Sequence, residues 1–438
     1  MSSSIKAADV TAVGLMTFAL FLGAGNMIFP PYLGQVAGPD LVVAILGFLL
    51  TGVGLPLLGV IATARLGGGL SSFTRDLPSW VAMVVGLVLY LSIGPLFAAP
   101  RTGIVAWEMS FAGAFPDAEY GQMIYSIAFF GVTLLLCLFP GRLIDNIGKI
   151  ITPMLVLVLL AIAAGVFLFP LGELGTVTGI KDSAFSWGFQ QGYQTMDTLA
   201  SLAFGIVIIT ALRQRGVTDK NEMTRYTITA GVIAAVGLAA VYLTLAYLGA
   251  TSHSVIPGAE NGADILTAYI EGLYGSWGTV LLGISITLAC LTTSVGLMTA
   301  CGEYFSEVLP MLGYRGWVIL CTLVSALIAN VGLTQLLEVT IPALLIIYPF
   351  AIALILLALV RGFLKSPIKT YMMTLLPVFV VGLVDGLAAS GVTWAAGISE
   401  GVLSWLPLHA DSLGWLAPGL AGFMLSLAGG SKENLAEA

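Results

Sequence analysis

The sequence predicts an all-α polytopic membrane protein with about twelve transmembrane helices. Of its 438 residues, 58% are hydrophobic and only 9% are charged, and the mean hydropathy is +1.02. Soluble domains usually carry about 25% charged residues, so most of this chain must face lipid or other helices. The net charge of −7 also argues against nucleic acid as a partner.

Apolar stretches of about 20 residues mark the expected spans, because that length crosses the hydrocarbon of a bilayer. They lie near residues 9–32, 40–66, 78–110, 121–140, 148–170, 189–212, 224–251, 277–308, 317–336, 341–361, 371–392 and 411–429. Between them, 252–276 is expected to be an extramembrane loop with a short helix at 263–273. A second loop is expected at 394–410, with an apolar part at the membrane interface.

The basic residues test this arrangement, because Lys and Arg favour cytoplasmic loops. With the N-terminus in the cytoplasm, all 16 basic residues fall on the cytoplasmic side except two. Lys181 lies in an outer loop and Arg101 lies within the third span. A wrong number of spans would scramble this alternation. We therefore predict a multi-pass protein of the cytoplasmic membrane with both termini in the cytoplasm.

The first span contains a polar, glycine-rich interruption at mid-membrane. Gly23, Ala24, Gly25 and Asn26 stand together there, and Gly and Asn are poor helix formers. Unwound backbone in a membrane is tolerated only where it lines a cavity. The alternative is close helix packing through small residues, which would not need the asparagine side chain.

The sixth span is interrupted as well, with a polar first half over residues 188–205 that includes Asp197, Thr198 and Ser201. Spans one and six begin two successive groups of five helices, which run in opposite directions because five is odd. Broken helices in corresponding positions of inverted repeats indicate a transporter's central site. We therefore divide the chain into a first five-helix unit at 9–170, an inverted second unit at 189–361, and two additional helices at 371–429.

Such breaks suit a zwitterion. The N-terminus of a half-helix attracts an anionic group such as an amino-acid carboxylate, while freed carbonyls hold an ammonium group or a cation. A sugar or a nucleobase would use this paired chemistry less well.

Charged residues inside a membrane are costly and need a reason. Arg101 and Asp197 lie at similar depths, so they could meet or serve two sides of a gate. The alternatives are that Arg101 extends to the outer interface and that Asp197 makes a structural helix–helix hydrogen bond. Asp385 lies outside both five-helix units, and we interpret it as a structural polar contact.

The eighth span contains adjacent hydroxyls at Thr292, Thr293 and Ser294. Hydroxyl and carbonyl oxygens suit a hard cation, although such residues often bond back to their own helix. The remaining reactive side chains predict no chemistry: the four cysteines are expected to be apolar core residues, and His253 and His409 ordinary residues of outer loops. No ATPase, hydrolase or zinc-protease motif is found, so no enzyme activity is expected.

Four segments in order resemble one known family. They are Gly23–Pro31 (GAGNMIFPP), Gly94–Thr102 (GPLFAAPRT), Gly192–Ala200 (GYQTMDTLA) and Leu291–Leu297 (LTTSVGL). Together they are similar to the bacterial branched-chain amino acid:cation symporters, the BrnQ-type carriers, over nearly the whole chain. The resemblance implies import of leucine, isoleucine and valine coupled to a cation, with Na⁺ as the expected ion. It also implies the leucine-transporter type of fold, with a five-plus-five inverted repeat and broken helices 1 and 6.

That fold implies further site residues. The substrate carboxylate would bind at the broken first helix, and the substrate would also contact the sixth helix. With the arginine of the third span, the candidate substrate-binding residues are Gly23, Ala24, Gly25, Asn26, Arg101, Asp197, Thr198 and Ser201. A cation site would combine the carbonyls of Ala19 and Leu22 with the hydroxyls of Thr293 and Ser294, or of Thr292 if the register shifts by one residue.

Other functions stay open at this point. A cation-coupled carrier of another small neutral amino acid would share these features. A channel would need rings of like charge or repeated carbonyl filters, and neither is present. The sequence does not rank leucine, isoleucine and valine, or decide Na⁺ against H⁺.

Overall fold

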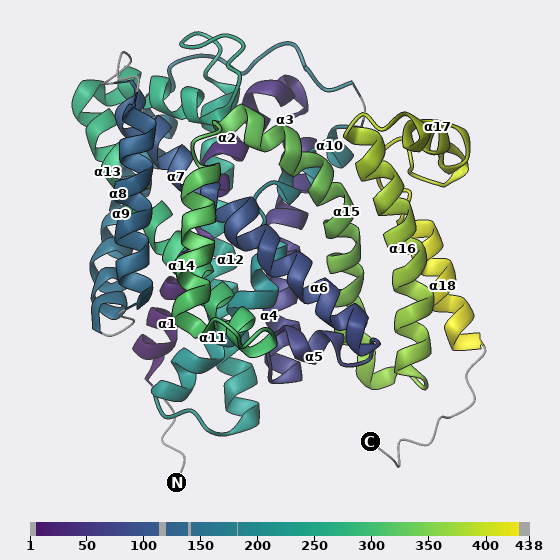
Figure 1. Ribbon diagram of the computed structural model, residues 1–438. Coiled ribbons are helices and arrows are strands. Elements are labelled where there is room, and N and C mark those ends of the chain that lie inside the picture. Colours follow the sequence, from purple (N-terminus) through teal and green to yellow (C-terminus); the bar gives the residue numbers. More distant parts are fainter. Residues whose placement is uncertain (1–5, 114–119, 139–141, 182, 429–438) are drawn as a thin grey trace.

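The computed structural model describes residues 6–113, 120–138, 142–181 and 183–428, and its regular structure in these ranges is entirely helical (Figure 1). In chain order the elements are α1 (Ala7–Phe21), α2 (Ala24–Ala37), η1 (Gly38–Asp40), α3 (Leu41–Leu49), η2 (Leu50–Gly54), α4 (Leu55–Leu66), α5 (Leu70–Thr74), α6 (Ser79–Leu91), η3 (Ser92–Leu96), α7 (Ala98–Trp107), η4 (Glu108–Ala112), α8 (Gly121–Leu138), α9 (Arg142–Leu168), α10 (Ala184–Tyr193), α11 (Asp197–Gln214), α12 (Lys220–Ala250), α13 (Gly262–Val308), α14 (Gly313–Ile328), α15 (Leu333–Val360), η5 (Arg361–Phe363), α16 (Pro367–Ala389), α17 (Thr393–Gly401), η6 (Leu403–Trp405) and α18 (Leu416–Ala428).

Eight of the helices within the described ranges are long and apolar enough to cross a membrane, and four shorter apolar helices accompany them. The long ones carry many exposed large apolar side chains, such as Leu46 at 56% and Ile127 at 63% exposed. Such exposure would be costly in water but matches the hydrocarbon of a bilayer. The chain is a multi-pass helical membrane protein.

Both predicted interruptions are real breaks in the backbone. α1 ends at Phe21 and α2 begins at Ala24, with Gly23 in an extended conformation between them. α10 ends at Tyr193 and α11 begins at Asp197, and Met196 adopts the left-handed conformation with φ of 62°. Left-handed backbone is strained for a residue with a side chain, so surrounding contacts must hold this turn.

A third break was not predicted, since the third span was expected to run without interruption over 78–110. Instead, α6 passes into the π-helical turn η3, where Gly94 has φ of −90° and ψ of −117°, before α7 starts at Ala98. Pro95 explains the break, because its ring lacks an N–H group and clashes with the preceding turn. The Gly-Pro pair is the local signal that could have predicted it.

Glycines bring α2 and α12 into close contact. A Cβ on Gly34 of α2 would overlap the carbonyl of Ala246, and a Cβ on Gly249 of α12 would overlap the carbonyl of Pro31. The two backbones can approach this closely only because both positions lack side chains. This contact brings α12, including Tyr242, beside the first broken helix.

Helices lie at the predicted positions of the spans, but several ends differ from the prediction: α2 continues to Ala37, and α9 and α10 begin at Arg142 and Ala184. The short helix expected at 263–273 is present, joined to the eighth span through Gly275 with φ of 63°. The helices of the ninth and tenth predicted spans, α14 and α15, also begin earlier than predicted, at Gly313 and Leu333. Gly332, with φ of 102°, separates them, since only glycine adopts that conformation easily. Within 394–410, the structure has α17 and a short 3₁₀ turn.

The C-terminal helices contain a small polar cluster. The Ser399 hydroxyl lies 3.1 Å from the Asp385 carboxylate and 3.1 Å from Nε2 of His409. Asp385 is thus a structural polar contact, as predicted. His409 corrects the prediction of an ordinary surface residue, since its side chain is only 12% exposed. The four cysteines are buried and free, as expected.

Candidate functional site

The break between α1 and α2 is stabilised by its own asparagine. The backbone N–H of Gly23 donates to Oδ1 of Asn26 at 2.9 Å, which closes the start of α2. The first N–H groups of a helix have no partner within that helix, so those of α2 are available for an anionic group. A carboxylate is one group that such N–H donors bind.

The break between α10 and α11 presents a second helix start to the same place. The Thr195 hydroxyl donates to the Gly192 carbonyl at 2.9 Å, which helps to hold the turn. α11 then starts with Asp197 as its first residue. An acidic side chain in this position is favoured by the positive end of the helix dipole.

Asp197 joins the two breaks. Its side chain is only 2% exposed, and Oδ2 accepts hydrogen bonds from Nδ2 of Asn26 at 2.6 Å and from the Tyr242 hydroxyl at 2.7 Å. Asn26 also donates to the Tyr242 hydroxyl. Across the described ranges, no basic side chain forms an ion pair with this carboxylate. The site therefore contains a buried carboxylate with two hydrogen-bond donors and no paired cation.

Arg101 is buried rather than extended to the interface. It is 3% exposed, and Nη1 donates to the Gln194 carbonyl at 2.7 Å. Its guanidinium carbon lies 5.3 Å from the centre of the Phe29 ring, a cation–π contact. Within the described part of the chain, Nε has no hydrogen-bond partner. The alternative of a snorkelling arginine is wrong, because α7 is packed inside the bundle.

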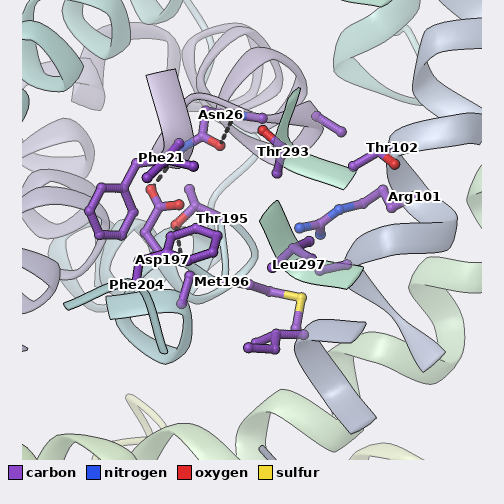
Figure 2. A pocket seen from close by; sticks show the side chains of 17 residues that line it. Phe21, Asn26, Arg101, Thr102, Thr195, Met196, Asp197, Phe204, Thr293 and Leu297 are labelled. Atoms are coloured by element: carbon purple, nitrogen blue, oxygen red, sulfur yellow. Dashed lines mark hydrogen bonds between the residues drawn. The ribbon is translucent and has the colours of Figure 1, made fainter. Parts of the chain in front are cut away.

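These groups surround one small cavity, shown in Figure 2. Arg101 enters from one side, while Asp197 and Asn26 lie on the other. Of the predicted residues, those that line it are Gly23, Ala24, Gly25, Asn26, Arg101, Asp197 and Thr293. The apolar part of the wall includes Leu20, Phe21, Ile93, Ala98, Phe204 and Leu297. The cavity volume is about 30 Å³, room for about one water, so helices must separate before any larger molecule can enter.

Two predicted substrate residues do not line this cavity. The Thr198 hydroxyl donates to the Thr51 carbonyl at 3.0 Å, and the Ser201 hydroxyl donates to the Thr198 carbonyl at 2.7 Å. A Cβ on Gly59 of α4 would overlap the Ser201 hydroxyl, so that side chain faces α4. In this structure, both hydroxyls bond to backbone carbonyls and pack between helices.

The predicted cation ligands come partly together. The Thr293 hydroxyl lies 3.4 Å from the Leu22 carbonyl, which is freed by the helix break. The Ser294 hydroxyl is completely buried and, within the described ranges, has no hydrogen-bond partner. Thr292 differs: it is half-buried and donates to the Ala289 carbonyl at 2.8 Å, back within its own helix. Ala19 is buried, but it does not line the cavity.

Sequence reasoning missed several residues of this site. Tyr242 lies in an apolar span with no local irregularity, so nothing near it in the sequence indicates a role. Thr195 and Met196 line the cavity and were inside a segment already quoted for its resemblance. Ile93 and Ala98 flank the unpredicted break in the third span, and the Gly94–Pro95 pair could have indicated them.

Comparison with known proteins gives one consistent family. A family described as branched-chain amino acid transport protein matches residues 6–432. The branched-chain amino acid transport system 2 carrier protein of Pseudomonas aeruginosa is 49% identical over 415 residues, 94% of each chain. The permease BraB of Bacillus subtilis is 42% identical over 445 residues and all of both chains. The permease BrnQ of Escherichia coli is 39% identical over 431 residues, 98% of this chain and 97% of its own.

Solved structures with the same fold are more distant in sequence. A Na⁺-coupled sialic acid symporter aligns with a TM-score of 0.66 and 13% identity, over 98% of this chain and 91% of its own. MhsT in complex with L-phenylalanine aligns with a TM-score of 0.59 and 17% identity, over 95% of this chain and 97% of its own. The nucleobase-cation symporter Mhp1 aligns with a TM-score of 0.60 and 12% identity, over 96% of this chain and 91% of its own. At such identities the likeness establishes the fold alone.

Proposed function

Because the chain belongs to the branched-chain amino acid transport protein family, we propose that it imports leucine, isoleucine and valine by symport with a cation. The motif resemblance is thereby confirmed: the protein is a branched-chain amino acid carrier and not an enzyme. What we propose beyond the family is the direction of transport, the coupling ion and the roles of the site residues. Na⁺ is the proposed ion, and the bacterial cytoplasmic membrane is the proposed location.

One observation carries this proposal, namely opposite buried charges on two sides of a cavity at two helix breaks. The substrate carboxylate would bind the free N–H groups of α2 and the Arg101 guanidinium. The substrate ammonium would bind the Asp197 carboxylate, which has no paired cation among the described residues. Phe204 and Leu297 would contact the branched apolar side chain. A zwitterion with an apolar side chain matches each part of this wall.

The proposed cation site is at the end of α1, next to the same cavity, which Thr293 also lines. The carbonyls of Ala19 and Leu22 and the hydroxyls of Thr293 and Ser294 would be its ligands. The partnerless Ser294 hydroxyl supports this assignment, because a buried polar group without a partner is costly. All-oxygen ligands suit Na⁺. In the described ranges, no group of three His, Cys, Asp or Glu side chains offers an alternative metal site.

We propose the wider architecture from the same breaks. It has about twelve spans, both termini in the cytoplasm, a five-helix unit at 9–170, an inverted unit at 189–361, and two further helices at 371–429. Broken helices at corresponding positions support inverted repeats that alternate access to a central site. The basic residues at the ends of α4 and α11 and between α15 and α16 support the orientation.

Proteoliposomes containing the purified carrier would test coupling. We expect an imposed inward Na⁺ gradient to drive uptake of labelled leucine. A membrane potential of 100 mV would by itself allow up to about fiftyfold accumulation of leucine per cation transported. A proton gradient of equal size without Na⁺ serves as the comparison. Uptake that ignores both gradients would exclude symport, and currents far above a carrier's turnover would favour a channel. Competition by small unbranched neutral amino acids would measure how specific the site is.

The eighth-helix hydroxyls permit a matched test of the cation site. We expect Thr293→Val and Ser294→Ala each to raise the Na⁺ concentration for half-maximal uptake by about tenfold, because each removes an oxygen ligand. Thr292→Val should stay within about twofold of the wild type, since that hydroxyl bonds within its own helix. The measurement is leucine uptake against Na⁺ concentration. An effect at Thr292 instead would move the site by one residue.

A further inference from the structure

A large apolar groove lies outside the substrate site. It is bounded by α6, α15 and α16, which stand beside one another in Figure 1, and its volume is about 550 Å³. The lining includes Trp80 and Val84 of α6, Phe350 of α15, and Leu376 and Phe379 of α16. Side chains of this groove are also exposed on the molecular surface, Trp80 at 70% and Leu376 at 58%. The groove therefore opens toward the bilayer.

The chemistry of the groove limits what can occupy it. The side chains that line it are apolar, apart from the indole N–H of Trp80, so a hydrogen-bonding solute would lose its partners on entry. Its volume lies in the range of sites that hold small ligands. The apolar molecule available at this position in a membrane is a lipid acyl chain.

A charged cluster stands at one end of the groove. Asp76 directly precedes Leu77, which lines the groove, and accepts hydrogen bonds from Arg361 at 2.5 and 3.0 Å. Arg75 approaches the same carboxylate only to 3.9 Å, and its side chain is 45% exposed. Among the described residues of this cluster, two guanidinium groups share one carboxylate, which leaves a net positive charge. An anionic group is the natural complement.

A partnerless hydroxyl marks the same end. Tyr371, next to Met372 of the groove wall, is completely buried, and within the described ranges its hydroxyl has no hydrogen-bond partner. The charges of Arg75, Asp76 and Arg361 all act on this hydroxyl, which places it in the neighbourhood of the cluster. It does not line the groove and is closed off from the surface, so a lipid phosphate would contact the two arginines rather than this hydroxyl.

We propose that this groove binds one anionic phospholipid, with an acyl chain between α6, α15 and α16 and the phosphate at Arg75 and Arg361. The orientation proposed above assigns the lipid to the cytoplasmic leaflet, where anionic headgroups attract basic side chains. The site is also connected to transport. Leu202 of α11 lines the groove, about one and a half turns beyond the helix start that carries Asp197. Occupancy of the groove would bias the position of α11.

Native mass spectrometry of the purified full-length carrier tests the proposal. We expect one molecule of phosphatidylglycerol to be retained in preference to phosphatidylethanolamine at equal lipid concentration. Val84→Trp should lower that occupancy at least fivefold, because the larger side chain fills the groove. Met83→Trp is the matched control, since Met83 is also 48% exposed but does not line the groove. Arg75→Gln should weaken phosphatidylglycerol binding about fivefold and leave phosphatidylethanolamine unchanged.

Three results would overturn the proposal. One is equal retention of the lipid by Val84→Trp and the wild type. Another is no preference between the two lipids together with no effect of Arg75→Gln, which would indicate ordinary annular lipid. The third is a dimer that Val84→Trp dissociates, which would make the groove an interface between copies of this chain. Val84→Phe replaces Val84→Trp if the larger side chain prevents folding. Because binding is measured without transport, the result does not depend on the proposed coupling.

Discussion

Replacing Asp197 with asparagine is expected to lower the initial rate of leucine uptake at least about 100-fold. Asparagine keeps an oxygen that can accept from Asn26 and Tyr242, so the turn at the start of α11 should persist. What disappears is the buried negative charge proposed to bind the substrate ammonium. Losing one partner of a buried charge pair costs about 2–5 kcal/mol, and about 2.7 kcal/mol already corresponds to 100-fold.

Asp385→Asn is the matched control for this prediction. Asp385 is also a membrane-embedded aspartate, but it contacts Ser399 rather than the cavity. Uptake by this variant should stay within about twofold of the wild type. Leucine binding to the purified Asp197→Asn variant, measured by calorimetry, separates two roles. Lost binding supports direct contact with the substrate, whereas intact binding without transport assigns Asp197 to gating or coupling. If uptake by Asp197→Asn stays within tenfold of the wild type, Asp197 neither contacts the substrate nor takes part in gating or coupling.

Gly25→Ala is expected to abolish uptake, although it adds a single methyl group. A Cβ at this position would lie 2.9 Å from Nη2 of Arg101, 3.1 Å from the Gln194 carbonyl oxygen and 3.2 Å from Cα of Thr195. Two of these neighbours are backbone atoms of the other helix break, so they cannot move aside easily. The methyl group would push the two breaks apart and fill the space beside the guanidinium. Overpacking of this kind usually costs about 1–3 kcal/mol of stability.

Gly131→Ala in α8 provides the control, because a Cβ there has no atom within 4 Å. It should transport normally and be slightly more stable, since alanine favours the helix by about 1 kcal/mol. Uptake should be normalised to the amount of folded carrier in the membrane, with thermal unfolding measured in parallel. Normal uptake by Gly25→Ala would show that the two breaks are further apart during transport than they are in this structure.

Much of the architecture follows from local properties of the chain. The spans are long apolar stretches, and their order agrees with the distribution of Lys and Arg. The breaks at Gly23 and near Asp197 were predictable, because glycine and polar residues disfavour a helix where they stand. The break at Gly94–Pro95 was equally local and was missed, although a proline after glycine within a span is a direct signal.

The side-chain contacts of the site were less predictable. The sequence indicated Arg101 and Asp197 as buried charges, but not that Arg101 bonds to the Gln194 carbonyl or that Tyr242 bonds to Asp197. The polarity of Thr198 and Ser201 was evident, yet in this structure both hydroxyls bond to backbone carbonyls away from the cavity. Hydropathy identifies a polar residue, but it does not identify the residue that its side chain will contact.

The membrane class, the order of the apolar helices, two of the three helix breaks and the family could all be predicted from the sequence. These depend on hydrophobicity, backbone propensity and motifs, which are properties of neighbouring residues. Which side chains converge depends on the three-dimensional packing of the helices. Contacts such as Gly34 against α12 set how closely the helices approach, and the way each helix then faces its neighbours turns Tyr242 toward Asp197 and Ser201 toward α4. These contacts join residues far apart in the chain, so no local sequence pattern predicts them.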